Sequence, residues 1–248
     1  MKNIIFISPN SFLKILSVVI VLLTLASAAG SLSEQLSIDN YLLAEARDSF
    51  IRLFIATGEA NIMAWYSSSA LLLCSFLLGI IAQAKKINHG VYILHWWILS
   101  LAFLYLSVDE AAVIHEMGRL PMRYLFNLGG IFYYGWIIPA GIAVLIFGLA
   151  YLKFLAHLPS KTKWLFVVSG GIFVGGAIGT VAIVGLLNDF YGQGRIASDE
   201  MLISIKTIGE FFEMLGIVIF IYALLDYMSS HFKQVSFQIV NQQPEKKI

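Results

Sequence analysis

The sequence has a single cysteine, Cys74, and little charge: 12% of its 248 residues are charged, and the net charge is +1. A lone cysteine in an apolar run excludes an internal disulfide, a CxxC metal site and a c-type haem attachment site. Soluble domains carry about twice this charged fraction, and the balanced charge gives no indication of nucleic-acid binding. The composition is 59% hydrophobic, with a mean hydropathy of +0.82. It predicts a polytopic membrane protein whose partners are membrane lipids.

About six apolar segments are long enough to cross a bilayer core, which needs about 20 helical residues. We therefore predict an all-α, polytopic transmembrane helix bundle that forms one integral membrane domain over residues 1–248, with a cytoplasmic tail at 230–248. Pro139 predicts a bend in the fourth span, and glycines repeating every four residues predict close packing by the fifth. The predicted spans are 12–29, 62–84, 91–110, 131–155, 164–187 and 207–229, and the glycines are Gly171, Gly175 and Gly179, with Gly170 and Gly176 beside them.

The link between the first two spans, residues 30–61, has an amphipathic pattern. Its polar side carries Glu45, Asp48 and Arg52, with Asp48 and Arg52 spaced to form an ion pair. We expect an interfacial amphipathic helix between spans 1 and 2. The residues on its apolar side are Leu43, Ala46, Phe50, Leu53 and Phe54.

The orientation is predicted from lysine and arginine, which are enriched in cytoplasmic loops. If the N-terminus is cytoplasmic, ten of these cations lie inside and six outside, so we predict that both termini are cytoplasmic. The inner group is Lys2, Lys14, Lys85, Lys86, Lys153, Lys161, Lys163, Lys233, Lys246 and Lys247, and the outer group is Arg47, Arg52, Arg119, Arg123, Arg195 and Lys206.

The first span also has the features of a signal peptide. Lys2 and Lys14 precede an apolar stretch that ends Ala26-Ser27-Ala28, which is typical of a cleavage site. A retained signal anchor gives six spans, whereas cleavage leaves five. The orientation of the remaining spans is the same in both cases.

The predicted topology places thirteen of the fifteen acidic residues outside, and several of them mark helix ends. Four helices therefore bring carboxylates or amides to a similar depth, where they form a candidate polar site at the extracytosolic face. If 107–116 continues as one helix, Asp109 and Glu116 are seven residues apart and share a face. The candidate residues are Glu59, Asn61, Ser107, Asp109, Glu110, His115, Glu116, Glu210 and Glu213.

Three hypotheses fit this cluster. Acids near helix ends are compatible with a structural or assembly role, which we favour. Carboxylates with one imidazole also suit a divalent metal ion, and such a site would serve a metal-dependent hydrolase acting on a lipid or envelope substrate. The third is a proton- or cation-coupled carrier, although the middles of the spans carry almost no ionisable residue. The candidate metal ligands are Asp109, His115, Glu116, Glu210 and Glu213.

Other chemistry is disfavoured by the positions of the histidines. No histidine lies in the middle of a span, so no bis-histidine haem is expected within the bundle. Ser107 and His115 are eight residues apart, too far along one helix for direct contact, which disfavours nucleophilic catalysis by that pair. Whether the chain is an enzyme stays open, as does its oligomeric state.

Three segments resemble an uncharacterised family of bacterial multi-pass membrane proteins: Glu59-Ala60-Asn61-Ile62 with Trp65-Tyr66-Ser67-Ser68; Leu106 to Ala112 with His115-Glu116; and Glu210 with Glu213-Met214-Leu215-Gly216. The resemblance implies a bacterial inner membrane location and no particular activity. A fainter resemblance, carried by Ser107 and Asp109, is to the alkaline ceramidase-like membrane hydrolases. Those enzymes pair zinc with histidines on a late helix, where this chain has Glu210 and Glu213.

Overall fold

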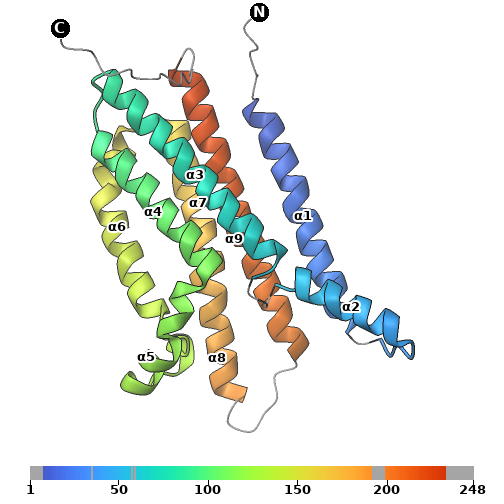
Figure 1. Ribbon diagram of the computed structural model, residues 1–248. Coiled ribbons are helices and arrows are strands. Elements are labelled where there is room, and N and C mark those ends of the chain that lie inside the picture. The colour runs from blue at the N-terminus through green and yellow to red at the C-terminus, as the bar shows by residue number, and fades with distance from the viewer. Residues whose placement is uncertain (1–7, 35, 57, 59, 192–198, 233–248) are drawn as a thin grey trace, which may run out of the picture.

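The computed structural model describes residues 8–34, 36–56, 58, 60–191 and 199–232, and these fold as helices without any strand (Figure 1). Six helical segments are long and apolar enough to cross a membrane, which confirms the predicted bundle. Most of the tail predicted at 230–248 lies outside the described residues. The six segments are α1 (Pro9–Ser33), α3 (Ile62–Ile87), α4 (Ile93–Ala112), α6 (Ile137–His157), the continuous run Ser160–Phe190, and α9 (Asp199–His231).

The fourth and fifth spans differ from their predicted form. α6 begins at Ile137 rather than 131, because residues 130–132 form a short 3₁₀ turn, η2 (Gly130–Phe132). Pro139 consequently lies in the first turn of α6, where its missing N–H removes no intrahelical bond. The fifth span is divided into α7 (Ser160–Val174), a π-helical segment η3 (Gly175–Thr180) and α8 (Val181–Tyr191).

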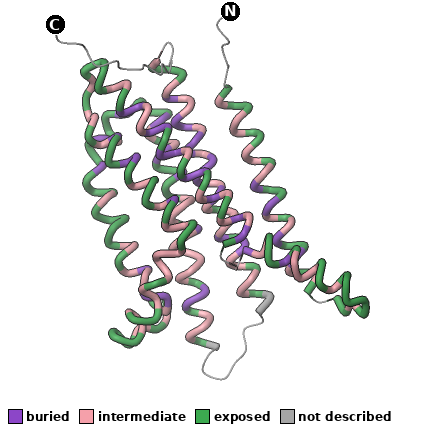
Figure 2. The backbone as a smooth tube through the Cα atoms, in the orientation of Figure 1, coloured by how far each residue is buried: buried purple, intermediate pink, exposed green. Residues whose placement is uncertain are grey.

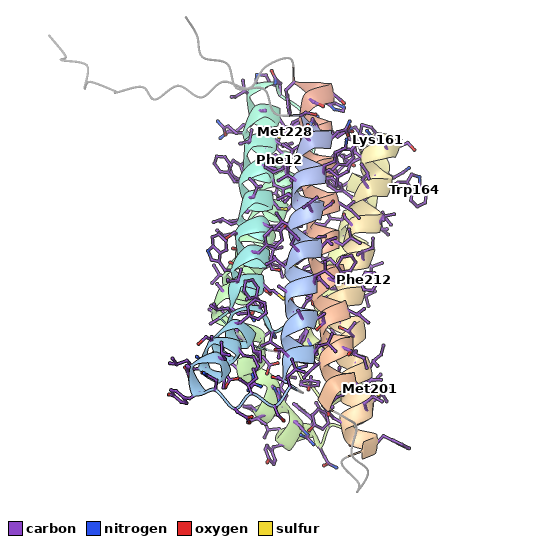
Figure 3. All side chains as sticks on the ribbon, turned by 90° about the vertical axis from the view of Figure 1, so that its right-hand side faces the viewer. Phe12, Lys161, Trp164, Met201, Phe212 and Met228 are labelled. Carbon is purple, nitrogen blue, oxygen red and sulfur yellow. The ribbon has the colours of Figure 1, made fainter. Side chains whose placement is uncertain are left out.

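Helix α9 is the centre of the bundle and packs against α1, α3 and α7. Figure 2 shows the buried residues gathered along α3 and α9, whereas α6 is largely exposed. The core contains Leu78, Trp96, Phe154 and Leu224, all almost fully buried. Phe12 of α1 and Met228 of α9 pack against the same cluster, and both lie towards one end of the bundle (Figure 3). The exposed apolar side chains of α6 face outward, as expected for helices surrounded by lipid.

Helices α3 and α4 are joined by two reciprocal pairs of serine hydrogen bonds. The hydroxyls of Ser68 and Ser107 each donate to the other's backbone carbonyl at 2.8 Å. Ser75 and Ser100 repeat the arrangement at 2.7 and 2.8 Å. The two pairs are separated by seven residues on each helix, so they lie on one antiparallel seam. Small residues at this spacing let the two backbones approach closely.

The close contact between the fifth span and α9 is made by Gly176, which lies beside the predicted stripe, and by Gly209 and Gly216 of α9. A Cβ on Gly176 would lie 2.7 Å from the Gly209 carbonyl oxygen, and one on Gly216 would lie 2.8 Å from the backbone of Ser169 and Phe173. The predicted stripe has no such contact: nothing lies within 4 Å of a Cβ on Gly171, Gly175 or Gly179. The prediction of close packing by that stripe was therefore wrong.

The link after α1 contains the predicted amphipathic helix, α2 (Tyr41–Phe54). Asn40 caps it by accepting hydrogen bonds from the N–H groups of Leu42 and Leu43. Arg52 forms its ion pair with Glu45 at 3.6 Å rather than with Asp48, which pairs with Arg47 at 2.9 Å. The predicted partner of Arg52 was therefore wrong.

Helix α2 and the short helix α5 (Arg119–Phe126) lie at the same end of the bundle, which we call the α2–α5 end (Figure 1). The described chain starts near Pro9 and stops after His231 at the opposite end. Under the predicted topology, the α2–α5 end is extracytosolic.

Candidate functional site

Asp109 and His115 form a pair at the α2–α5 end, through a turn that the sequence did not indicate. α4 ends at Ala112, and Val113 takes the left-handed conformation with a φ of 54°. A 3₁₀ segment, η1 (Ile114–Gly118), follows and turns the chain back. Asp109 then accepts hydrogen bonds from the His115 N–H at 2.8 Å and from the ring, with Nδ1 3.0 Å from Oδ2. The prediction that 107–116 forms one helix was therefore wrong.

This contact sets the charge of His115. Burial alone lowers the pKa of the imidazole, but the hydrogen bond and charge of Asp109, together with the charges of Glu116 and Glu110, raise the pKa above its usual 6.5. The ring of Trp136 lies edge-on to the His115 ring, with centroids 4.9 Å apart. The Trp136 Nε1 is buried without a hydrogen-bond partner in the described part of the chain. Asp109 thus fixes the orientation of the ring and favours the imidazolium form.

Glu116 forms an ion pair with a residue of the helix that follows it. Its carboxylate pairs with Arg119 at 2.8 Å, and the Arg119 guanidinium lies 4.8 Å from the Tyr134 ring centroid. Burial raises the pKa of the Tyr134 hydroxyl, which accepts a hydrogen bond from Asn188 Nδ2 at 3.1 Å. Glu116 therefore belongs to a network that ties η1 and α5 to α8.

Two further candidates have structural roles, and one cannot be placed. Asn61 caps α3, accepting from the Ala64 N–H at 2.9 Å and donating to the carbonyls of Ile55 and Gly58 at 2.7 Å. Ser107 is engaged with Ser68 in the α3–α4 seam. Glu59 lies outside the described residues.

Three carboxylates remain: Glu110 in the last turn of α4, and Glu210 and Glu213 on one face of α9. All three are half-buried. The charge of Glu110 acts on Glu210 and Glu213, so the three carboxylates lie within the range of mutual electrostatic interaction. None of them makes a hydrogen bond or an ion pair with another described residue. We call Glu110, Glu210 and Glu213 the carboxylate trio.

Two further residues lie near the carboxylate trio. A Cβ on Gly176 would lie 2.8 Å from Glu213 Cγ, so this glycine makes room for the Glu213 side chain beside the π-helical segment. Lys206 stands four residues before Glu210, a spacing at which an ion pair can form on one helix face. It lies close enough for its charge to act on Glu210 but forms no ion pair with it. The glycine pattern of the fifth span predicted a close approach of two helices, but the contact is made by Gly176 beside the stripe and not by the stripe itself.

The candidate metal ligands are not assembled into a chelating site. Within 8–34, 36–56, 58, 60–191 and 199–232, no three His, Cys, Asp or Glu side chains are arranged to hold an ion. Asp109, His115 and Glu116 are bound in local pairs, whereas Glu210 and Glu213 belong to the carboxylate trio. The hypothesis of a metal-dependent hydrolase therefore gains no support from the geometry.

Comparison with known proteins gives a family without an assigned activity. Residues 15–228, which cover most of the first and last spans and all of the four between them, match the family described as a domain of unknown function, DUF8692. The chain belongs to this family. No curated protein and no solved structure matches it. DUF8692 membership therefore agrees with the expected uncharacterised family, whereas the ceramidase resemblance and the bacterial origin gain no support.

Proposed function

We propose that this chain binds protons at the carboxylate trio, as the coupling site of a proton-coupled membrane carrier. The observation that carries the proposal is that Glu110, Glu210 and Glu213 have no hydrogen-bond or ion-pair partner among the described residues and lie within the range of mutual electrostatic interaction. The other candidate residues that the structure describes all have local partners. These three are therefore the part of the predicted site that is free to react.

Electrostatics favours protons as the ligand. Like charges in a low-dielectric bundle repel each other strongly, and carboxylates inside membranes commonly form proton relays. Each proton bound at the trio removes part of this repulsion. A shared metal ion is a poorer fit, because the described carboxylates do not form a chelating group of three. Two buried hydroxyls without described partners, those of Tyr66 and Ser67, add polar groups to the neighbouring helix α3.

The arrangement also supports entry from the α2–α5 end. His115 acts electrostatically on Glu110 and Glu210, and Glu213 lies one turn further along α9. Beyond Glu213, α9 carries no further Asp, Glu, Lys, Arg or His until Asp226. Transport across the membrane therefore requires a movement of the helices. The π-helical segment beside Glu213 is suited to such a change, because π-helical turns are often found at functional sites.

Infrared spectroscopy tests proton binding directly. The C=O stretch of protonated carboxyl groups is recorded against pH for the purified protein in nanodiscs and for E110Q, E210Q and E213Q. We expect each variant to lose part of the titrating band and to shift the pH dependence of the remainder, because the three charges interact. The matched control is E45Q, which removes an exposed carboxylate paired with Arg52 on α2. Spectra of all three variants that superimpose on the wild type would refute the proposal.

A structural or assembly role is the second candidate, and a different observation favours it. Asp109, His115, Glu116, Asn61 and Ser107 are all held in hydrogen bonds or ion pairs that shape local turns or join helices. Under this hypothesis the function of the protein does not require the carboxylate trio. Replacing all three by glutamine would then leave cell growth, protein level and proton flux in proteoliposomes at wild-type values.

A further inference from the structure

The short helix α5 turns its arginines towards the bundle and leaves its large apolar residues exposed. The Arg123 guanidinium lies 3.7 Å from the Tyr133 ring centroid, and Arg119 lies over Tyr134. Both arginines therefore turn towards the bundle. A helix facing water would instead present its arginines outward and bury its leucines. The medium outside α5 is therefore expected to be apolar.

The outward side of α5 carries some of the most exposed apolar side chains of the described chain. Tyr124 is 84% exposed and Leu125 is 78% exposed, and the neighbouring Leu120 and Phe126 exceed 50%. The helix is nevertheless held firmly, because a Cβ on Gly135 would lie only 2.6 Å from Met122 Cβ. This apolar surface is thus a fixed feature of the bundle end. Contiguous exposed apolar surface of this kind marks a site of interaction.

We propose that α5 lies in the boundary between headgroups and acyl chains of the membrane leaflet at the α2–α5 end, with phospholipid as the occupant of its apolar face. The helix joins the ends of two spans, α4 and α6, and therefore lies at the depth where that boundary occurs (Figure 1). Amphipathic helices bury their apolar face about 5–10 Å into this boundary. The charge is complementary as well: Arg123 stacks on Tyr133 and has no carboxylate partner among the described residues, so its positive charge is left for lipid phosphates at the headgroup level to balance.

The sequence analysis predicted one interfacial helix, α2, and this proposal adds a second on another side of the bundle. α5 has only eight residues, so its pattern is too short to stand out from the neighbouring apolar segments. The proposal is independent of proton binding at the carboxylate trio. It depends only on the location of α5 at the ends of the spans and on the exposure of its apolar side.

Spin labelling measures what surrounds α5. Cysteine is introduced singly at Tyr124 and at Leu125, and each variant is labelled with a nitroxide and placed in nanodiscs of phosphatidylethanolamine and phosphatidylglycerol. Cys74 is fully buried and does not compete for the label. Collision with oxygen, which concentrates in lipid, is compared with collision with a water-soluble nickel chelate. The lipid reference is L145C on α6, which is 63% exposed, and the water reference is S160C at the exposed first residue of α7.

The proposal expects labels at both α5 positions to match the oxygen-dominated accessibility of the Leu145 label. Accessibility to nickel equal to that of the Ser160 label would overturn it and place α5 in water. Low accessibility to both reagents would also overturn it, because a protein partner or a second copy of the chain would then cover the helix. Both substitutions are on exposed side chains, and unchanged elution in size-exclusion chromatography checks that each variant is folded.

Discussion

The imidazole Nδ1 of His115 lies 3.0 Å from Asp109 Oδ2, and the same carboxylate accepts the His115 backbone N–H at 2.8 Å. One side chain thus ends helix α4, closes the following turn and orients a titratable ring. The ring nitrogen Nε2 makes no hydrogen bond to a described residue, the ring packs edge-on against Trp136, and the charge of His115 acts on Glu110 and Glu210. The pair therefore joins a structural turn to the place where we propose that protons bind.

The first prediction concerns the pH dependence of stability. The pKa of His115 is raised above its unfolded value of 6.5. The stability contributed by the pair is therefore fully present below pH 6.5 and is lost as the pH rises through the raised pKa. We expect D109N to have a lower melting temperature than the wild type, with the largest difference below pH 6.5. Thermal unfolding of both proteins in detergent across a pH series measures this difference.

The matched control for that series is D48N. It removes the Arg47–Asp48 pair, whose distance is 2.9 Å, without touching a histidine. Its effect on the melting temperature should not change through the titration of His115. An effect of D109N that is equally independent of pH would show that Asp109 acts only through the backbone hydrogen bond.

The extent of the helices was largely predictable because the membrane imposes one length and one polarity on every span. The predicted ends fail where apolar residues are not helical. Residues 131–136 are apolar and aromatic, but Gly130 has a φ of 58° and starts a 3₁₀ turn, so α6 begins later. Hydropathy did not predict the π-helical segment Gly175–Thr180 either. Hydropathy measures solvent preference and carries no information on the local hydrogen-bond register.

The sequence predicted which end of the bundle carries the candidate residues, but it did not predict how their side chains are arranged. The calculation of a shared face for Asp109 and Glu116 assumed a continuous helix, whereas Val113 in the left-handed conformation ends it. A residue other than glycine or asparagine rarely takes that conformation, so a valine at this position does not predict the end of a helix. The glutamates of α9 were identified correctly as a pair on one face. Their contact with Gly176 depends on the approach of two helices, which spacing along one chain does not determine.

The serine seam predicts measurable coupling between α3 and α4. Replacing Ser75 or Ser100 by alanine removes one hydroxyl donor, and interhelical hydrogen bonds in membranes are worth about 0.6 kcal/mol on average. We expect each single variant to lose about this much stability, and the double variant to lose less than the sum. Unfolding by denaturant in mixed micelles gives the four free energies. The control is S69A, which alters an exposed serine on the same helix and should be neutral.

Packing of α1 on α9 gives a third prediction. Ile20 is 1% exposed and lies in a cluster with Met214 and Val218, whereas Leu22 is 60% exposed. We expect I20A to destabilise the protein by about 2 kcal/mol, the lower end for a buried isoleucine, because lipid rather than water replaces the lost contact. L22A should change the free energy of unfolding little. Equal effects of the two variants would mean that α1 is not held against α9.

The glycines give the sharpest contrast, because two similar substitutions are expected to have opposite signs. In G216A the new Cβ would lie 2.8 Å from the backbone of Ser169 and Phe173. Backbone cannot move aside as a side chain can, so α7 and α9 must separate, at a cost of about 1–3 kcal/mol. In G171A the Cβ meets nothing within 4 Å, and the gain in helix propensity is about 1 kcal/mol. Melting temperatures of the two variants should therefore fall on opposite sides of the wild type. If G171A proved as damaging as G216A, the predicted Gly171, Gly175 and Gly179 stripe would be a contact surface after all.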